Sequence, residues 1–350
     1  MNEIGLKFID SNTTTTMHIL DSRAIVSDII WTIMRILEKG DEIRVIAPSQ
    51  SWGKRKYQRD YERAEERLES LGYKVTYGKS VKNVLHFGTA TREDRAEDLN
   101  EAYENKNIKL VMALSGGWSA NEVLPLIDWQ IVRANPKPLI GFSDITVLLN
   151  AIYAKTGVSG FLGPNFSTFG RMPEWQYTLN NFESAMQGSS QRLTKSRSWG
   201  ERGSKRYRTK SWQCLEVGKA NAKLLGGNLG TLYLLQGTEY QPKFDESFIF
   251  LLEDDDEAGG YTAREVSRRF ESLLQLPNFR DNLQGLIMGR FQKGSNISEK
   301  DITSIIVSKN LGSIPIAYNV DFGHTLPMLT LPIGLEISLI VDNKVNILLP

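Results

Sequence analysis

Ser143 and Asp144 stand in the segment PLIGFSDITVLLNAIYAK (residues 138–155), between a short apolar run and an apolar helix-like run. A serine that follows a strand and opens a helix has the geometry of a nucleophile elbow, in which a sharp turn exposes the hydroxyl for attack. The match to G-x-S-x-G is partial, because Gly141 is present but Ile145 replaces the second glycine. Serine and aspartate are also common helix N-caps, and the local sequence alone favours that structural role.

A serine nucleophile of this kind needs a base, and histidine is scarce in the chain: only His18, His86 and His324 are present. His18 lies in a polar stretch near the N-terminus, and the surroundings of His86 are typical of a solvent-exposed loop. His324 stands in NVDFGHTLPMLTLP, between predicted strands. A lone loop histidine is usually only a surface residue, but His324 is the best candidate for an imidazole base.

A third group usually orients such an imidazole and stabilises its charged form. The apolar run FIFLLE ends at Glu253, so a buried strand is predicted to position this carboxylate. The acidic run EDDDE (253–257) is open to other interpretations, namely a solvated turn or a metal site. Calcium would need a longer, spaced set of oxygen ligands, so no metal is expected.

Ser119 competes for the role of nucleophile, because the segment SGGWSAN follows the apolar run IKLVMAL. Gly116 and Gly117 permit backbone conformations that other residues resist. Successive amides there could form an anion-binding nest or half of an oxyanion hole. A simple turn with a helix cap is the alternative, since two adjacent glycines are a weak signal by themselves.

Apolar strand-like runs alternate with helix-like runs through the first half of the chain. This alternation predicts a parallel sheet with helices on both faces. Ligands bind beyond the carboxyl ends of the strands in such sheets, and both SGGWSAN and GFSD fall at those ends. The strands are predicted at residues 43–47, 73–77, 108–114 and 138–142.

A length of 350 residues favours two domains. Residues 1–33 look unlike the rest and are predicted to be an appendage, with a natural start at Met34 as the hypothesis. Residues 34–165 form the first α/β domain, and 218–350 a second domain of mixed α/β type. Between them, 166–217 lose the regular pattern, and the basic stretch TKSRSWGERGSKRYRTKSW predicts a linker or active-site loop.

The composition is 41% hydrophobic and 24% charged, with a formal net charge of +1. This balance gives no reason to expect nucleic acid or a membrane as a partner. The single cysteine, Cys214, excludes an internal disulfide and fits a reducing compartment. The chain has no apolar run of the roughly 18 residues that span a bilayer and no basic-then-apolar signal pattern, so a cytoplasmic location is expected.

Seven segments together resemble the LD-carboxypeptidase family of serine peptidases, and within it the microcin C immunity protein group. They run from about Lys39 to Gly334, and their order and spacing make the resemblance specific, although each segment alone is not. They are GDEIRVIAPS, SGGWSANEVLPLIDW, NPKPLIGFSDITVLLNAIYAKTG, GFLGPN, LLGGNLGTLYLLQGTEYQP, FIFLLEDDDE and DFGHTLPMLTLPIG.

The resemblance implies an N-terminal flavodoxin-like or amidotransferase-like parallel-sheet domain and a smaller C-terminal mixed α/β domain, with the active site between them. The family's catalytic serine in G-[FYH]-S-D falls on Ser143, its glutamate on Glu253 and its histidine, in F-G-H, on His324. Its oxyanion donors fall on the backbone amides of Gly117 and Asp144. The resemblance also implies a homodimer, and no cofactor is expected.

Two departures point to one branch of the family. Members that trim cell-wall peptides resemble R-G-G-Y-G where this chain has SGGWS, and a long insert precedes Cys214. Both features resemble the immunity branch, whose enzymes cleave the bond between an amino acid and a modified nucleotide. In the insert, Trp or Tyr could stack on a base and Arg could meet phosphate, although a solvated loop is an equal alternative. The predicted substrate-binding residues are Gly116, Trp118, Ser119, Asn121, Trp199, Tyr207 and Trp212.

The sequence therefore predicts a hydrolase in which Ser143 attacks, His324 acts as general base and then acid, and Glu253 orients His324. The expected substrate is an aminoacyl nucleotide or a small peptide. A murein tetrapeptide LD-carboxypeptidase of cell-wall recycling is the alternative enzyme. A catalytically silent protein that sequesters a nucleotide-like ligand is the third hypothesis.

Overall fold

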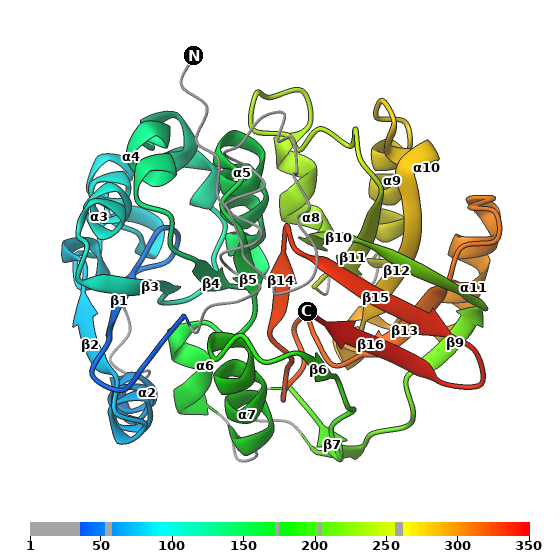
Figure 1. Ribbon diagram of the computed structural model, residues 1–350, viewed down its shortest axis with the longest axis horizontal. Coiled ribbons are helices and arrows are strands. Elements are labelled where there is room, and N and C mark those ends of the chain that lie inside the picture. Colours follow the sequence, from blue (N-terminus) through cyan, green and yellow to red (C-terminus); the bar gives the residue numbers. More distant parts are fainter. Residues whose placement is uncertain (1–35, 53–57, 172–174, 202–204, 256–261) are drawn as a thin grey trace, which may run out of the picture.

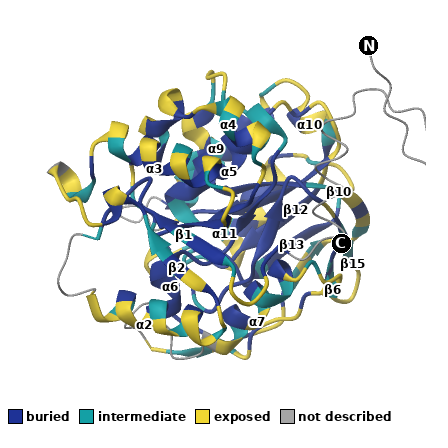
Figure 2. Ribbon diagram, turned by 60° about the vertical axis from the view of Figure 1, so that its left-hand side comes forward, coloured by how far each residue is buried: buried dark blue, intermediate teal, exposed yellow. Residues whose placement is uncertain are grey.

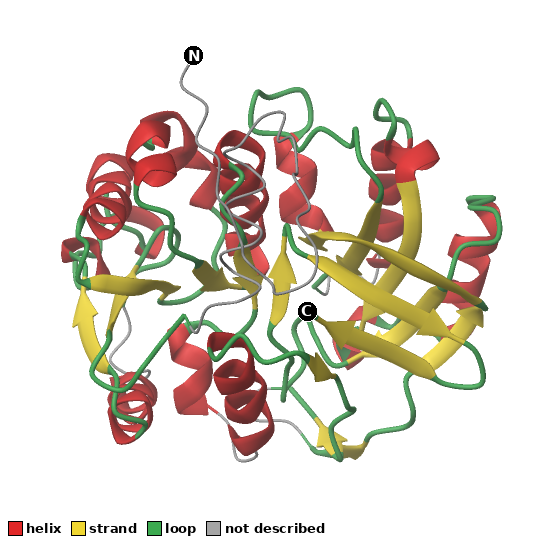
Figure 3. Ribbon diagram, viewed as in Figure 1, coloured by secondary structure: helices red, strands yellow, loops and turns green. Residues whose placement is uncertain are grey.

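The computed structural model describes residues 36–52, 58–171, 175–201, 205–255 and 262–350. Two β-sheets lie side by side, and helices pack around each of them (Figure 1, Figure 3). The appendage predicted at the N-terminus lies outside the described residues.

The first sheet has six strands in the order β14-β5-β4-β3-β1-β2. Strands β1 to β5 are parallel, and their order 2-1-3-4-5 is that of the flavodoxin-like fold, which confirms the prediction for this half. The sixth strand comes from the last part of the chain and pairs antiparallel with β5, so both halves of the chain build this sheet. The strands are β1 (Glu42–Ile46), β2 (Lys74–Tyr77), β3 (Ile108–Ala113), β4 (Leu139–Gly141), β5 (Gly160–Leu162) and β14 (Leu331–Ile333).

Alternate side chains of β3 are buried on opposite faces of the first sheet. Leu110 and Met112 belong to one apolar cluster, which α2, α6 and α7 cover, whereas Val111 and Ala113 belong to a second cluster with α3, α4 and α5 (Figure 1, Figure 2). Strands buried on both faces are almost continuously apolar, which explains the run IKLVMAL. The helices are α2 (Gln58–Ser70), α3 (Arg92–Glu104), α4 (Trp129–Ala134), α5 (Thr146–Thr156), α6 (Phe166–Arg171) and α7 (Trp175–Met186).

Helices α6 and α7 correct the prediction that regular structure is lost from residue 166 onward. Phe169 of α6 and Phe182 of α7 are buried with their ring centroids 5.3 Å apart, in the core of the first sheet. Interspersed Asn, Ser, Thr and Gly residues in these helices obscured the apolar period. The described residues between α7 and residue 217 then form short strands: β6 (Gln191–Arg192), β7 (Ser198–Trp199), β8 (Tyr207–Arg208) and β9 (Gln213–Glu216).

The second sheet has eight strands in the order β6-β16-β15-β10-β11-β12-β13-β9. Its four central strands, β10 to β13, are parallel, and the flanking strands are antiparallel, so the sheet is of the mixed type expected. The carboxyl ends of the central strands lie at one edge. The remaining elements are β10 (Gly218–Asn228), α8 (Leu229–Leu232), β11 (Phe248–Glu253), α9 (Thr262–Leu274), α10 (Phe279–Asn282), β12 (Leu283–Gly289), α11 (Glu299–Ser308), β13 (Ile316–Val320), β15 (Glu336–Val341) and β16 (Val345–Leu349).

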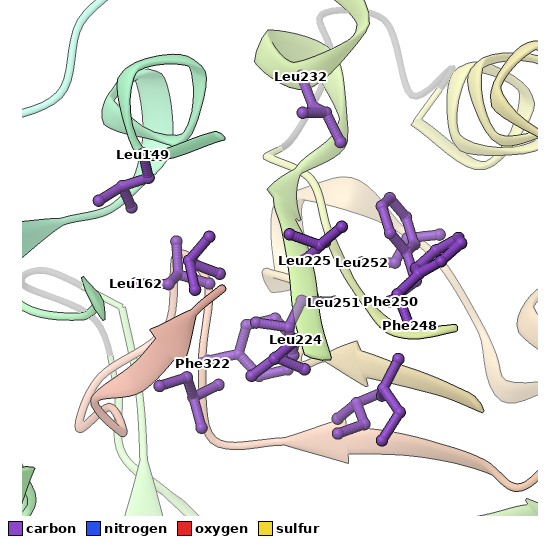
Figure 4. Close-up of a cluster of buried hydrophobic side chains, with 14 of the residues drawn as sticks. Leu149, Leu162, Leu224, Leu225, Leu232, Phe248, Phe250, Leu251, Leu252 and Phe322 are labelled. Carbon is purple, nitrogen blue, oxygen red and sulfur yellow. The ribbon is translucent and has the colours of Figure 1, made fainter. Parts of the chain in front are cut away.

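One apolar core connects the two sheets. Leu149 of α5 and Leu162 of β5 belong to the same cluster as Leu224 and Leu225 of β10 (Figure 4). Helix α5 is buried around most of its circumference, which is why its sequence is apolar without a clear polar face. The helix that follows the candidate nucleophile is therefore packed against both halves of the molecule.

Candidate active site

Ser143 occupies a sharp turn directly after β4. Phe142 is extended, whereas Ser143 has φ +63°, a left-handed conformation that residues with a side chain seldom adopt. The chain then continues through the 3₁₀ helix η5 (Ser143–Ile145) into α5. Strained backbone of this kind is found at functional sites.

The helix-cap interpretation of Ser143 and Asp144 was wrong. Phe142 is the N-cap of η5 and Ile145 that of α5, and neither position has a side-chain cap bond. The tight turn places both polar side chains elsewhere: the Ser143 hydroxyl faces a histidine, and the Asp144 carboxylate faces a neighbouring loop.

The side chains of Ser143, His324 and Glu253 form a hydrogen-bonded chain. The distance from Ser143 Oγ to His324 Nε2 is 2.9 Å, and that from His324 Nδ1 to Glu253 Oε2 is 2.8 Å. Ser143 follows β4 of the first sheet, Glu253 ends β11, and His324 follows β13 of the second sheet. The two hydrogen bonds thus connect the first sheet to the second. The order of the three side chains matches that of a nucleophile, a base and an acid that orients the base.

Two glycines make room for the buried carboxylate of Glu253. A Cβ atom at Gly289 would lie 3.0 Å from Glu253 Cβ, and one at Gly323 would lie 2.9 Å from Oε2. On its other side, the imidazole of His324 contacts the Phe142 ring edge-on, with centroids 5.5 Å apart. Packing therefore restricts the orientation of both members of the pair.

The pKa of His324 lies above its ordinary value. Burial alone would lower this pKa, but the charge of Glu253 and its hydrogen bond to the imidazole raise it, and the nearby charges of Asp255 and Asp254 add to the rise. The same carboxylate that orients the ring therefore also stabilises the imidazolium form.

The glycine pair of SGGWS lies against Ser143. A Cβ atom at Gly116 would be 2.9 Å from Ser143 Oγ, so no larger residue fits beside the hydroxyl. Gly117 has φ +154°, and a Cβ atom there would collide with Ser49 Oγ. Because the glycine pair lies so close to Ser143, the amides of Gly117 and Asp144, which are the predicted oxyanion donors, belong to segments next to the Ser143 hydroxyl.

The carboxylate of Asp144 anchors the glycine loop. Its Oδ2 accepts hydrogen bonds from the backbone amides of Ser119 and Ala120, each at 2.8 Å, and from Ser49 Oγ at 2.5 Å. Burial raises the pKa of Asp144, against the opposing effect of these bonds and of the Arg95 charge. The sequence analysis missed this role, because nothing in GFSD links the aspartate to a loop 24 to 25 residues earlier.

Ser119 has a structural place in this network. The buried guanidinium of Arg95 donates to the Ser119 carbonyl and hydroxyl, both at 3.0 Å, and to the Pro48 carbonyl at 2.8 Å. The hydrogen-bond partner of His324 Nε2 is Ser143. The geometry therefore favours Ser143 over Ser119 as the nucleophile.

Two other predicted substrate-binding residues lie on the same segment. Trp118 follows the glycine pair and is 58% exposed, so its indole is available to a ligand. Asn121 is half-buried in the 3₁₀ helix η4 (Ala120–Leu126). The Trp118 ring is accordingly the stronger candidate for a ligand contact.

Two of the three predicted aromatic residues of the insert, Trp199 and Trp212, are buried, and Tyr207 is half-buried. Trp199 and Tyr207 face each other across the β7–β8 pair, with ring centroids 4.9 Å apart. Trp212 is buried, and its Nε1 donates to Asp321 at 2.8 Å. This contact gives Trp212 a role in holding the insert in place.

Asp321 connects the insert to the loop that carries His324. Besides Trp212, it accepts bonds from the Ser196 amide and hydroxyl at 3.0 and 2.6 Å, and it pairs with Arg290 Nη2 at 2.7 Å. Asp321 lies three residues before His324. The sequence analysis missed it, because an Asp before F-G-H carries no signal of its own.

No group of three or more His, Cys, Asp or Glu side chains in the described ranges is arranged to hold a metal ion. In the same ranges, no helix has the length and apolar character needed to cross a membrane.

Comparisons with known proteins identify the family of the chain. The family model described as the LD-carboxypeptidase N-terminal domain matches residues 43–163, and that of the C-terminal domain matches 221–339. A putative carboxypeptidase of Treponema pallidum (strain Nichols) is 37% identical over 88% of this chain and 92% of its own length.

Two solved structures have the same fold. An MccF-like protein from Bacillus anthracis superposes with a TM-score of 0.84 at 35% identity, covering 89% of this chain and 97% of that one. The microcin C7 self-immunity protein MccF, in complex with aspartyl sulfamoyl adenosine, superposes with a TM-score of 0.78 at 29% identity, covering 89% and 96%.

Proposed function

This chain belongs to the LD-carboxypeptidase family. We propose that it hydrolyses the bond between an amino acid and a nucleotide-like group. Membership makes it a serine carboxypeptidase-type hydrolase. The observation that carries the proposed mechanism is the hydrogen-bonded chain of Ser143, His324 and Glu253 across the two sheets.

In the first half of the proposed reaction, Ser143 Oγ attacks the substrate carbonyl while His324 Nε2 takes the hydroxyl proton. Glu253 stabilises the imidazolium that forms, as its effect on the pKa of His324 indicates. The amides of Gly117 and Asp144 donate to the oxygen that becomes negatively charged. His324 then protonates the leaving group, and an acyl-enzyme remains on Ser143.

In the second half, a water molecule attacks the acyl-enzyme and His324 again acts as the base. Collapse of this second intermediate returns the proton to Ser143 Oγ and releases the amino-acid carboxylate. No step needs a metal or a cofactor, because the chain's own groups supply the nucleophile, the proton transfers and the charge stabilisation.

Three features support the nucleotide-like substrate. MccF, whose structure holds aspartyl sulfamoyl adenosine, shares the fold over most of this chain. Trp118 is exposed beside the glycine pair, and Trp199 and Tyr207 stand among basic residues of the insert. Aromatic rings and arginines of this kind suit a base and a phosphate.

A murein tetrapeptide LD-carboxypeptidase is the second candidate. The activity named in the description of the matching family models favours it, and the same catalytic groups would cleave the peptide bond before a terminal D-residue. A silent binding protein is disfavoured, because the serine, histidine and glutamate are all present and hydrogen-bonded.

The test is a side-by-side assay of aspartyl sulfamoyl adenosine and a murein tetrapeptide, read by mass spectrometry. Faster release of aspartate from the nucleotide mimic is the expected result. Cleavage of the tetrapeptide alone would establish the murein function instead. Binding of the mimic without turnover of either compound would establish a sequestering protein.

The homodimer and the cytoplasmic location stay predictions. Sedimentation velocity of the full chain at micromolar concentration is expected to give a species of twice the chain mass, and a monomer over that range would contradict the dimer.

A further inference from the structure

His324 follows a segment with irregular backbone, residues 319–323. The pairing of β13 with β12 shifts register between Ile287 and Gly289. Asn319 has φ +61° and Gly323 has φ +97°, so both lie in the left-handed region. Bulges and left-handed residues re-aim side chains at functional sites, but they interrupt the ladder of a regular strand. The position of His324 therefore depends on contacts other than strand pairing.

Arg290, the first residue after β12, supplies several of these contacts. Its side chain is buried, with Nε donating to Asn319 Oδ1 at 2.9 Å and Nη2 to the Asn319 carbonyl at 3.4 Å. Nη2 also pairs with Asp321 Oδ1 at 2.7 Å, and the backbone amide of Arg290 donates to the Phe322 carbonyl at 3.3 Å. A guanidinium presents its donors in one rigid plane. One residue thus ties three residues of the segment together.

The segment lies close against Glu253. Phe322 is buried in the core that connects the two sheets (Figure 4). A Cβ atom at Gly289 would lie 2.7 Å from the Phe322 carbonyl oxygen, and one at Gly323 would lie 2.9 Å from Glu253 Oε2. A shift of residues 321–323 would therefore disturb both the imidazole of His324 and its bond to Glu253.

The charge of Arg290 is used within the protein. Asp321 neutralises the guanidinium, and the centroid of the Trp199 ring lies 5.1 Å from it. Ser196 and Trp212 of the insert donate to the same carboxylate. Arg290 thus lies where the insert, β12 and the segment before His324 meet, and its bonds serve the fold of that segment.

Proton transfer sets a narrow tolerance for the position of His324. Its Nε2 lies 2.9 Å from Ser143 Oγ, and a general base has to stay within hydrogen-bond reach of the proton that it takes. A misplacement of about 1 Å, caused by a change away from the reacting atoms, costs roughly 10²-fold in rate.

We propose that Arg290 is a positioning residue for His324. By tying residues 319–322 together, it holds the imidazole in line with Ser143 and Glu253. The inference rests on the proposed role of His324 as the base, and it adds a residue that acts without touching the substrate.

Substitution of Arg290 tests the proposal through the split between kcat and KM. R290M removes the guanidinium but keeps a long side chain, and kcat is expected to fall by roughly 10²-fold with KM near its wild-type value. R290K keeps a charge beside Asp321 without the planar fork, so its kcat should lie between those of R290M and the wild type. A raised KM with wild-type kcat would overturn the proposal, because Arg290 would then act on the substrate.

K137M is the matched control. Lys137 is also a buried cation that holds backbone, since its Nζ donates to the carbonyls of Ala102 and Asn105 at 2.9 and 2.7 Å. It precedes β4, whereas Ser143 follows that strand. K137M should lower the midpoint of thermal unfolding but keep the wild-type kcat. An equal drop of kcat in K137M and R290M would contradict a specific role of Arg290.

Proton NMR of the imidazole gives a readout that a merely structural role would not move. A hydrogen bond from an imidazole N–H to a carboxylate shifts that proton far downfield, and loss of the signal in H324Q identifies it. The signal is expected in the wild type and in K137M, and it should be displaced or lost in R290M. A folded R290M protein with the wild-type signal and the wild-type kcat would overturn the proposal.

N319G covers the case in which R290M does not fold, as judged by circular dichroism. It removes the Oδ1 acceptor of Arg290 Nε, and glycine adopts the left-handed backbone of Asn319 freely. We expect kcat to fall roughly tenfold, the worth of one hydrogen bond to a charged group. Wild-type kcat together with the wild-type imidazole signal in N319G would reject the positioning role.

Two readouts need no natural substrate, so this proposal and the proposed function can fail separately. If the wild-type protein cleaves neither the nucleotide mimic nor the tetrapeptide, the rate at which a fluorophosphonate probe labels Ser143 replaces kcat, with S143A as the blank. Equal labelling of the wild type and R290M overturns the positioning role alone. If the wild type is not labelled, the nucleophile assignment fails, and the imidazole signal still decides whether Arg290 positions His324.

Discussion

Asn150 exchanges two hydrogen bonds with the backbone of Gly226: its Oδ1 accepts from the Gly226 amide at 3.1 Å, and its Nδ2 donates to the Gly226 carbonyl at 3.0 Å. Asn150 lies on α5, the helix that follows the turn at Ser143, and Gly226 lies on β10, beside the strand that ends at Glu253. A Cβ atom at Gly226 would collide with the Leu251 carbonyl. These bonds therefore fix the helix that follows Ser143 to the sheet that carries Glu253 and precedes His324.

Replacing Asn150 by leucine should lower both stability and activity. The variant keeps the side-chain size but leaves the Gly226 amide and carbonyl unpaired in the core, at a cost of about 2–4 kcal/mol in the free energy of unfolding. Urea unfolding measures this cost, and kcat is expected to fall with it, because the distance between Ser143 and His324 is no longer fixed. Asn181→Leu is the control, since among the described residues Asn181 bonds only the Tyr177 carbonyl of its own helix. Equal losses in the two variants would contradict the role of Asn150.

Asp144→Asn should impair catalysis while keeping the residue's backbone amide. The asparagine side chain keeps one oxygen acceptor but loses the negative charge that strengthens the bonds to Oδ2, so the loop with Gly117 is anchored less firmly. We expect kcat to fall by roughly 10²-fold, the size of effect found when one oxyanion donor is lost. Steady-state kinetics checks this. Asp128→Asn removes a carboxylate that also accepts two backbone amides, but at the start of α4, and it should leave kcat unchanged. A matching drop in kcat for Asp128→Asn would contradict the specific role of Asp144.

The pH dependence of kcat/KM should show the influence of Glu253 on His324. Attack needs a neutral imidazole, so the rate should rise with pH through an apparent pKa above the ordinary histidine value of about 6.5. Glu253→Gln removes the charge that raises this pKa. The acid limb of the profile should then move to lower pH, while kcat falls by roughly 10³ to 10⁴-fold. A limb that stays in place would show that another group controls the titration.

Trp212 and Trp118 should respond differently to substitution. Trp212→Phe removes the bond from Nε1 to the buried Asp321 carboxylate, so the free energy of unfolding should fall by about 1.5–3 kcal/mol. Trp118→Ala changes an exposed side chain, so stability should change by less than about 0.5 kcal/mol while KM rises. Thermal unfolding together with KM measurements separates the two effects. A raised KM with unchanged stability in Trp212→Phe would return Trp212 to the substrate-binding set.

The sequence was most informative about groups at strand ends. Glu253 ends an apolar run and Ser143 follows one, and such runs are readable because buried parallel strands are apolar on both faces. The scarcity of histidine left His324 as the best base. These signals are local, and the resemblance to the family added their order along the chain.

Long-range relationships could not be predicted in this way. The bonds of Asn150 to Gly226 span 76 residues, and those of Asp321 to Ser196 span 125. Strand β14 joins the first sheet although its sequence is close to the C-terminus. Each of these three contacts depends on how the two halves of the molecule pack against each other. That packing cannot be predicted from residue types or from the period of apolar residues.

The central claim is that Ser143 is the nucleophile, and the rate of the S143A variant tests it most directly. The measurement is single-turnover hydrolysis of the substrate that the wild-type protein cleaves, with unfolding free energies compared in parallel. The account predicts a loss of about 10⁴-fold or more in a variant that is as stable as the wild type. Hydrolysis within about tenfold of the wild-type rate would contradict it.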